Sequence, residues 1–158
     1  MTKTVLITGA AHRIGRAVAL GLAEDSWKVI IHYSNSGKSA NELAQNINEK
    51  GGNAETLQAN LADALETASL ISRALEIAGP LSALINNASV FERDDVTTLS
   101  DESWDMHLNV NLKAPAILMR DFAKQAQAGS NIINIIDQRV WRLNPDFISY
   151  TVSKTGLW

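Results

Sequence analysis

The sequence contains no cysteine, which excludes a disulfide framework and a thiolate metal site. Its three histidines, His12, His32 and His107, lie too far apart for the spacing of metal ligands, so we expect no structural metal. The chain also lacks any apolar run close to the roughly 18 to 20 residues that cross a bilayer. Its first residues enter a strand-like run without the pattern of a signal peptide. We therefore expect a soluble, cytoplasmic protein that is not inserted in a membrane.

Basic runs are absent as well, and the formal net charge is −3. This charge pattern gives no footprint for nucleic acid or for an anionic membrane surface, so a small-molecule partner is favoured. The chain has 158 residues, of which 46% are hydrophobic. That is enough for one domain with a core and leaves little room for a second. We expect a single domain over residues 1–158.

Short aliphatic runs alternate along the chain with apolar residues at helical spacing. The runs lie at residues 5–7, 29–31, 56–57, 83–85 and 132–136. Continuous apolarity is typical of strands that are buried on both faces, and the segments between them have the period of amphipathic helices. The alternation predicts an α/β fold, a doubly wound, Rossmann-like parallel sheet with right-handed crossovers.

A further helix is indicated by Leu108, Leu112, Met119 and Phe122. Pro115 lies inside this pattern, where it removes one helical hydrogen bond. We expect a long but kinked helix.

A phosphate-binding turn is predicted directly after the first strand, in the run Thr8-Gly-Ala-Ala-His-Arg-Ile-Gly15. Gly9 lets the chain turn sharply and Gly15 lets a helix pack closely, while free N–H groups at the helix start favour a pyrophosphate. The run differs from the GxGxxG pattern, and a simple tight connection is the alternative.

The second predicted strand ends in His32-Tyr33-Ser34, where a fold that selects NAD normally carries Asp or Glu for the ribose 2′-hydroxyl. Without that carboxylate, Arg13 and the Ser34 hydroxyl suit a 2′-phosphate, which favours NADPH. The alternative is that Arg13 lies on a solvated helix start, where a cation opposes the helix dipole.

Near the end of the sequence, Tyr150 and Lys154 are four residues apart, which brings them to one face of a helix. A free tyrosine titrates near pH 10, and a nearby ammonium favours the phenolate. We therefore expect Lys154 to lower the pKa of Tyr150 and to make it a usable proton donor.

Taken together, the loop TGAAHRIG, the Asn86-Asn87-Ala88 run, Asn111 and the pair Tyr150-x3-Lys154 resemble the short-chain dehydrogenase/reductase family over the whole chain. Three departures from that family resemble its pteridine reductase branch. The loop has Arg13 in place of a glycine and is followed by the strand end His32-Tyr33-Ser34. Asp137 replaces a serine thirteen residues before the tyrosine, and the run Asn87-Ala-Ser-Val-Phe91 matches that branch.

The resemblance implies a role for each of these positions. The implied cofactor-binding residues are Gly9, Arg13, Ile14, Gly15, His32, Tyr33, Ser34, Asn60, Leu61, Asn87, Ala88, Ser89, Tyr150 and Lys154. The implied catalytic residues are Asp137, Tyr150, Lys154 and Asn111, with Asn111 helping to hold a water beside Lys154. The implied substrate contacts are Ser89, Phe91, Asp137 and Tyr150, with Phe91 stacked on a flat ring. Asp137 as a turn cap and Phe91 as a core or lid residue are the alternatives.

The resemblance further implies an NADPH-dependent reductase that transfers hydride to a C=N bond of a pterin or dihydropterin. A reductase of another carbonyl, such as a 3-oxoacyl thioester, and a non-catalytic NADP-binding fragment are the alternatives. Members of this family continue for about another hundred residues, so we expect the sheet to be incomplete on its C-terminal side. We also expect the full-length enzyme to be a homo-oligomer.

Overall fold

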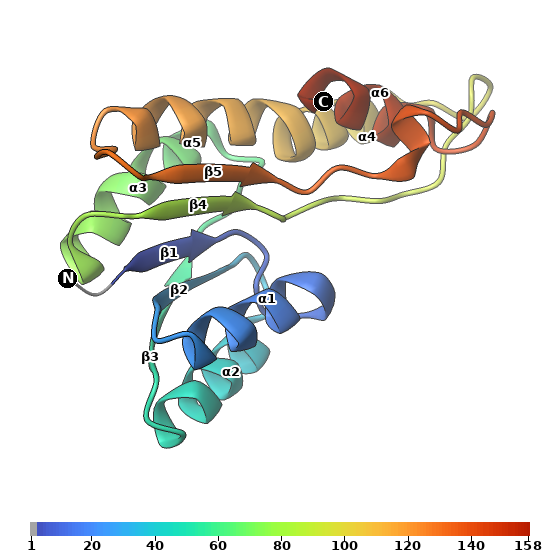
Figure 1. Ribbon diagram of the computed structural model, residues 1–158. Coiled ribbons are helices and arrows are strands. Elements are labelled where there is room, and N and C mark those ends of the chain that lie inside the picture. Colours follow the sequence, from blue (N-terminus) through green and yellow to red (C-terminus); the bar gives the residue numbers. More distant parts are fainter. Residues whose placement is uncertain (1–2) are drawn as a thin grey trace.

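The computed structural model describes residues 3–158 as a parallel sheet with helices on both faces (Figure 1). Its strands are β1 (Thr4–Ile7), β2 (Lys28–Tyr33), β3 (Asn53–Gln58), β4 (Ala83–Asn86) and β5 (Asn131–Asn134). Their order is β3-β2-β1-β4-β5, and every neighbouring pair is parallel. This is a doubly wound, Rossmann-like sheet, and the predicted fold class is confirmed.

The helices divide between the two faces of the sheet. Helices α1 (Arg13–Glu24) and α2 (Gly37–Glu49) cover one face, and α3 (Ala64–Ala78) and α5 (Ala114–Ala123) cover the other. Successive residues of a strand point to opposite faces, so Val5 packs under α1 and α2 while Leu6 packs under α3 and α5. Both are fully buried, as a central strand of such a sheet requires.

Strand β5 departs from the predicted pattern. It ends at Asn134, two residues earlier than expected, and 44% of Ile133 is exposed. The expectation of burial on both faces is wrong here, because β5 is the edge strand and pairs, within residues 3–158, with β4 alone. The chain then continues without regular secondary structure to Asp137.

The long helix after β4 is irregular, as predicted. Helix α4 (Asp101–Leu108) passes into a π-helical segment, η1 (Asn109–Lys113), and then into α5. Pro115 has no N–H to donate to the carbonyl of residue 111, and the wider turn lies just before it. The irregular turn carries Asn111. No helix within the described residues is both long and apolar enough to cross a membrane.

The carboxyl ends of the strands meet at one edge of the sheet, as the common direction of the arrows shows in Figure 1. The loop after β5 contains a short 3-10 turn, η2 (Gln138–Val140), and leads to α6 (Ile148–Leu157). Helix α6 packs against α4 and η1, where an added side-chain carbon on Gly156 would lie 3.0 Å from Leu112. This packing holds α6 beside the same edge.

Candidate active site

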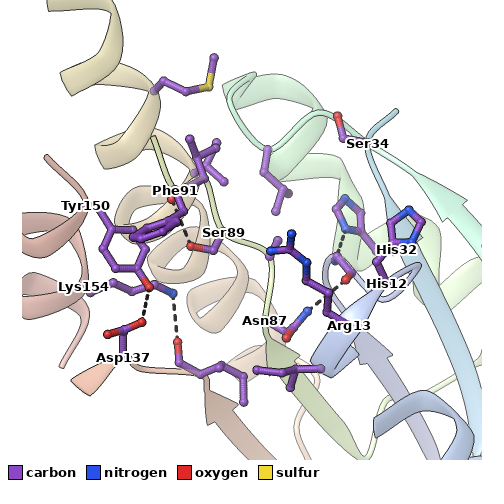
Figure 2. Close-up of a pocket in the computed structure, with 18 of the residues that line it drawn as sticks. His12, Arg13, His32, Ser34, Asn87, Ser89, Phe91, Asp137, Tyr150 and Lys154 are labelled. Atoms are coloured by element: carbon purple, nitrogen blue, oxygen red, sulfur yellow. Dashed lines mark hydrogen bonds between the residues drawn. The ribbon is translucent and has the colours of Figure 1, made fainter. Parts of the chain in front are cut away.

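A cavity of about 700 Å³ lies at the carboxyl edge of the sheet (Figure 2). Its size is within the range of small-molecule and cofactor sites. The predicted residues that line it are Gly9, Arg13, Ile14, His32, Ser34, Asn60, Leu61, Asn87, Ala88, Ser89, Phe91, Asp137, Tyr150 and Lys154. Gly15, Tyr33 and Asn111 do not line it. In the part of the chain that the structure describes, no three His, Asp or Glu side chains gather as metal ligands would.

The turn after β1 needs its two glycines for the predicted reasons. Gly9 has a φ of 62°, in the left-handed region, and a Cβ there would lie 2.9 Å from the Cα of Ala88. A Cβ on Gly15 would lie 2.6 Å from the Gly9 carbonyl oxygen, closer than packing allows. Helix α1 therefore starts close against the turn, and no side chain caps its first N–H groups. The first backbone N–H groups of α1 belong to Arg13 and Ile14, which line the cavity, and such groups can bind an anion.

Thr8 and Asn87 fasten this turn to the end of β4. The Thr8 hydroxyl oxygen accepts the N–H groups of Asn87 and Ala88, each at 3.0 Å. The Asn87 amide donates to the carbonyls of Thr8 at 2.9 Å and Gly9 at 3.0 Å. Asn87 therefore holds the turn with its amide N–H groups. Sequence reasoning gave Thr8 no role, although a hydroxyl at a strand end directly before the turn glycine was a visible signal.

His32 lies beneath the turn, where it is 1% exposed. Its Nδ1 accepts the Gly9 N–H at 3.0 Å, so Nε2 carries the proton and donates to the Ala59 carbonyl at 3.1 Å. Burial lowers the pKa of His32 to about 4, which keeps the ring neutral. Both nitrogens are used by the backbone, so the ring supports the turn, and its predicted contact with a cofactor stays a prediction. Tyr33, also expected to bind cofactor, packs against the core under α1 and α2.

The residues predicted to bind the adenosine end of a cofactor lie beyond this turn. Figure 2 shows the Arg13 side chain reaching into the cavity, between Ser34 on one side and Ser89 on the other. The end of β2 brings no carboxylate to the cavity, as the sequence indicated. Asn60 also lines it, and its side-chain oxygen accepts the Ala62 N–H at 3.1 Å, which leaves that oxygen a second acceptor position.

At the other end, α6 places Tyr150 and Lys154 in the cavity, facing Asp137 after β5 (Figure 2). The Tyr150 hydroxyl donates to one Asp137 oxygen at 3.0 Å. The other Asp137 oxygen accepts the Arg139 N–H at 2.8 Å, which caps η2. Asp137 is thus a turn cap and a contact of the tyrosine at once. The Lys154 ammonium donates to the Ile135 carbonyl at 3.0 Å and lies 5.9 Å from the centre of the Tyr150 ring.

The pKa of Tyr150 is shifted in the opposite direction to the one expected from the sequence. Burial, together with the hydrogen bond and charge of Asp137, raises the pKa of Tyr150 above its ordinary value. Burial also lowers the pKa of Lys154. The expectation that Lys154 lowers the pKa of Tyr150 is wrong for this arrangement, because the charged group that contacts the hydroxyl is a carboxylate. The tyrosine is therefore protonated at neutral pH.

The remaining predicted residues lie around the loop after β4. Asn111 is fully buried, and its amide is occupied: the oxygen accepts the Val90 N–H at 2.8 Å, and the nitrogen donates to the Val90 carbonyl and the Ser153 hydroxyl. This side chain holds the loop, and its predicted role in holding a water beside Lys154 stays a prediction. Phe91 is 51% exposed and lines the cavity, so it is not a core residue. Its ring stacks on Phe147, with the ring centres 4.3 Å apart.

Comparison with known proteins places the chain in a family. The model of the short chain dehydrogenase family matches residues 3–158. A short-chain type dehydrogenase/reductase of Picea abies is 36% identical over 98% of this chain and 61% of its own length. The 3-oxoacyl-[acyl-carrier-protein] reductase FabG of Staphylococcus aureus is 32% identical over 99% of this chain and 65% of its own length.

Among solved structures, FolM alternative dihydrofolate reductase 1 from Brucella canis, complexed with NADP, superposes with a TM-score of 0.93. It is 44% identical to this chain and covers 99% of it, whereas this chain covers 63% of the Brucella protein. This chain therefore spans less than two thirds of the length of these relatives. Since the family model matches all the residues that the structure describes, the chain belongs to the short-chain dehydrogenase family.

Proposed function

We propose that this chain carries the NADPH site and the proton-transfer group of a reductase that acts on a C=N bond of a pterin or dihydropterin. The observation that carries the proposal is the contact between the Tyr150 hydroxyl and the Asp137 carboxylate at the cavity, at 3.0 Å. A carboxylate accepts hydrogen bonds from the N–H groups of a nitrogen heterocycle. The serine of the wider family instead suits a ketone oxygen, as the family resemblance implies.

The residues around the turn fit a phosphorylated dinucleotide. Gly9 and Gly15 let the turn pack tightly against Ala88 and the start of α1, and the first N–H groups of α1 are available for a pyrophosphate. Arg13 supplies a cation to the cavity and Ser34 a hydroxyl at the end of β2, where no carboxylate opposes a 2′-phosphate. The structures of the Brucella relative and several others contain NADP, which supports the same choice here.

In this mechanism the bound cofactor supplies the hydride. Tyr150, protonated at neutral pH, donates its proton to the substrate nitrogen, and Asp137 orients the hydroxyl and holds the substrate N–H groups. Lys154 would hold the nicotinamide ribose with its ammonium, as the family resemblance implies. Phe91, on the cavity wall beside Tyr150, offers a flat face to the substrate ring.

A second candidate is reduction of a ketone, such as a 3-oxoacyl thioester, because the Staphylococcus aureus relative carries that name. Both candidates concern the whole polypeptide that carries this sequence, since the chain spans less than two thirds of these relatives.

The two candidates are separated by NADPH-oxidation assays on the complete polypeptide, with dihydrobiopterin and an acetoacetyl thioester as substrates. We expect turnover of the pterin, and we expect Asp137→Ser to lose most of that activity while retaining NADPH binding. Ketone reduction without pterin reduction supports the second candidate, and NADPH binding without any hydride transfer supports a non-catalytic module. The same assay on the 158-residue chain measures how much activity this part retains.

We also propose that the complete polypeptide is a homo-oligomer. Directly after helix α6, Trp158 lies against Trp141, with the ring centres 5.7 Å apart, and both are largely exposed. Exposed aromatic pairs are typical of contact surfaces, either with another part of the same polypeptide or with a second copy, and the family resemblance favours a second copy. Light scattering of the complete polypeptide tests this, and a monomer at micromolar concentration contradicts it.

A further inference from the structure

The segment that carries Phe91 has no regular secondary structure. It runs from the end of β4 towards α4, so its backbone N–H and C=O groups find no partners in a strand or helix. Side chains or water satisfy these groups, and bonds to fixed side chains are what hold the segment in one position. Because Phe91 is half exposed at the cavity, its position depends on how the backbone on either side of it is held.

Two buried side chains of the long helix hold the residues that flank Phe91. Asn111 bonds both backbone groups of Val90, at 2.8 and 2.9 Å. His107, four residues earlier and 0% exposed, accepts the N–H of Glu92 at its Nε2, at 3.1 Å. Phe91 therefore lies between two anchored neighbours.

The ring of His107 is oriented for this bond by its other nitrogen. Nδ1 donates to the Ser103 carbonyl at 2.7 Å, so it carries the proton and leaves a lone pair on Nε2. The ring centre is 6.5 Å from that of Tyr150, and His107 is not among the residues that line the cavity. It cannot touch a substrate there and acts through the segment it holds.

We propose that His107 is a positioning residue for flat-ring substrates: by binding the Glu92 N–H it fixes Phe91 as a rigid aromatic wall of the cavity. Phe147 supports the same wall from behind. It does not line the cavity, its ring is parallel to that of Phe91 within 5°, and its own N–H is bonded to the Asp94 carbonyl. A stacking surface that is already fixed costs the substrate no ordering on binding.

The inference rests on the proposed function, and the first test uses the complete polypeptide with dihydrobiopterin. His107→Phe keeps a ring of similar volume and removes the acceptor, while His107→Gln retains a side-chain oxygen that can accept the Glu92 N–H. We expect His107→Phe to raise the KM for the pterin about three- to tenfold, the size of one aromatic contact, with kcat and the Kd for NADPH within about twofold. His107→Gln should recover most of the KM.

A matched control exists at the far end of the long helix. Gln125 also holds a loop backbone: its side-chain oxygen accepts the Leu81 N–H at 3.0 Å, and its side-chain nitrogen donates to the Leu81 carbonyl at 3.2 Å. Leu81 lies just before β4, at the amino ends of the strands and away from the cavity. Gln125→Met removes both bonds and should leave the KM unchanged. General destabilisation lowers the amount of active enzyme and thus the apparent kcat, so it does not imitate a change confined to KM. An unchanged KM in His107→Phe, or a Gln variant no better than the Phe variant, overturns the proposal.

A second measurement does not need turnover. Amide hydrogen exchange over residues 90–94 should be at least tenfold faster in His107→Phe than in the parent or in Gln125→Met. If the parent protein does not reduce pterins, the proposed function fails and this measurement still decides the role of His107. Unchanged exchange in His107→Phe then counts against it.

Discussion

Acid should weaken the fold through His32, whose neutral ring joins the phosphate turn to the end of β3. In the unfolded chain a histidine has a pKa near 6.5, and burial lowers the pKa of His32 in the fold to about 4. Protonation also removes the lone pair that accepts the Gly9 N–H. The ring can therefore gain a proton readily only when the chain unfolds.

The sign and size of the effect follow from this difference. Well above pH 6.5, from about pH 7.5 upwards, both states are neutral at His32 and the fold has its full stability. As the pH falls from 6.5 towards 4, the unfolded state binds the proton first, and the free energy of unfolding decreases by up to about 1.4 kcal/mol per pH unit. From pH 7.5 to 4.5 the loss attributable to His32 is about 2.5 kcal/mol, and well below pH 4 it levels off at about 3.4 kcal/mol.

Urea unfolding followed by tryptophan fluorescence measures this loss, because the chain has four tryptophans. The informative quantity is the difference between the parent and His32→Gln at each pH, in which the other titrating groups cancel. That difference should decline between pH 6.5 and 4.5. NMR titration of the folded parent gives an independent check that needs no variant: a His32 ring that titrates above pH 5.5 refutes the argument.

Three further changes test other parts of the site and its frame. Gly15→Ala places a Cβ 2.6 Å from the Gly9 carbonyl oxygen. We expect urea unfolding to show a loss of about 1 to 3 kcal/mol in unfolding free energy, and fluorescence titration to show at least tenfold weaker NADPH binding. Asp137→Asn removes the charge beside the Tyr150 hydroxyl, so the pKa of Tyr150 should fall. Phenolate absorbance against pH measures this pKa. The measurement is made in a Tyr33→Phe background, because Tyr33 and Tyr150 are the two tyrosines of the sequence. Asp63 caps α3 through the N–H groups of Leu65 and Glu66, so Asp63→Ala should lower thermal stability by about 1 kcal/mol and Asp63→Asn should restore most of it.

Much of the frame could be predicted because it depends on local patterns. The aliphatic runs at residues 5–7, 29–31 and 83–85 mark the central strands, since burial on both faces excludes polar residues there. Strand β5 also contains adjacent isoleucines, Ile132 and Ile133, but it lies at the edge, and composition alone does not report which strand has neighbours on both sides. The order of the strands is a tertiary property.

The phosphate turn illustrates the same limit within the site. The spacing of Gly9 and Gly15 predicts the turn, because both positions need a residue without a side chain. The direction in which His32 points could not be predicted, since a strand end can face either the cofactor or the turn. Whether the ring binds a ligand or the backbone is decided by partners 23 and 27 residues away, Gly9 and Ala59.

The ionisation of Tyr150 was mispredicted for a related reason. The spacing of Tyr150 and Lys154 places them on one helix face, but it does not report what reaches the hydroxyl from elsewhere. Asp137 comes from a different strand end and contacts that hydroxyl directly. Desolvation and a neighbouring carboxylate then act in the same direction and outweigh the ammonium, whose hydrogen bond goes to the Ile135 carbonyl.

The distribution of charge along the cavity makes the two ends chemically distinct. Among the described residues that line it, Asp137 is the one carboxylate, and it lies at the end that holds Tyr150 and Lys154. Arg13 and the N–H groups of α1 lie towards the other end, where an anion is attracted and no acid repels it. A ligand with phosphate groups at one end and a ring with N–H groups at the other matches this gradient. A substrate whose reacting end is itself anionic would meet the Asp137 carboxylate, so Asp137→Asn should improve the binding of such a substrate while it weakens that of a ring that donates N–H bonds.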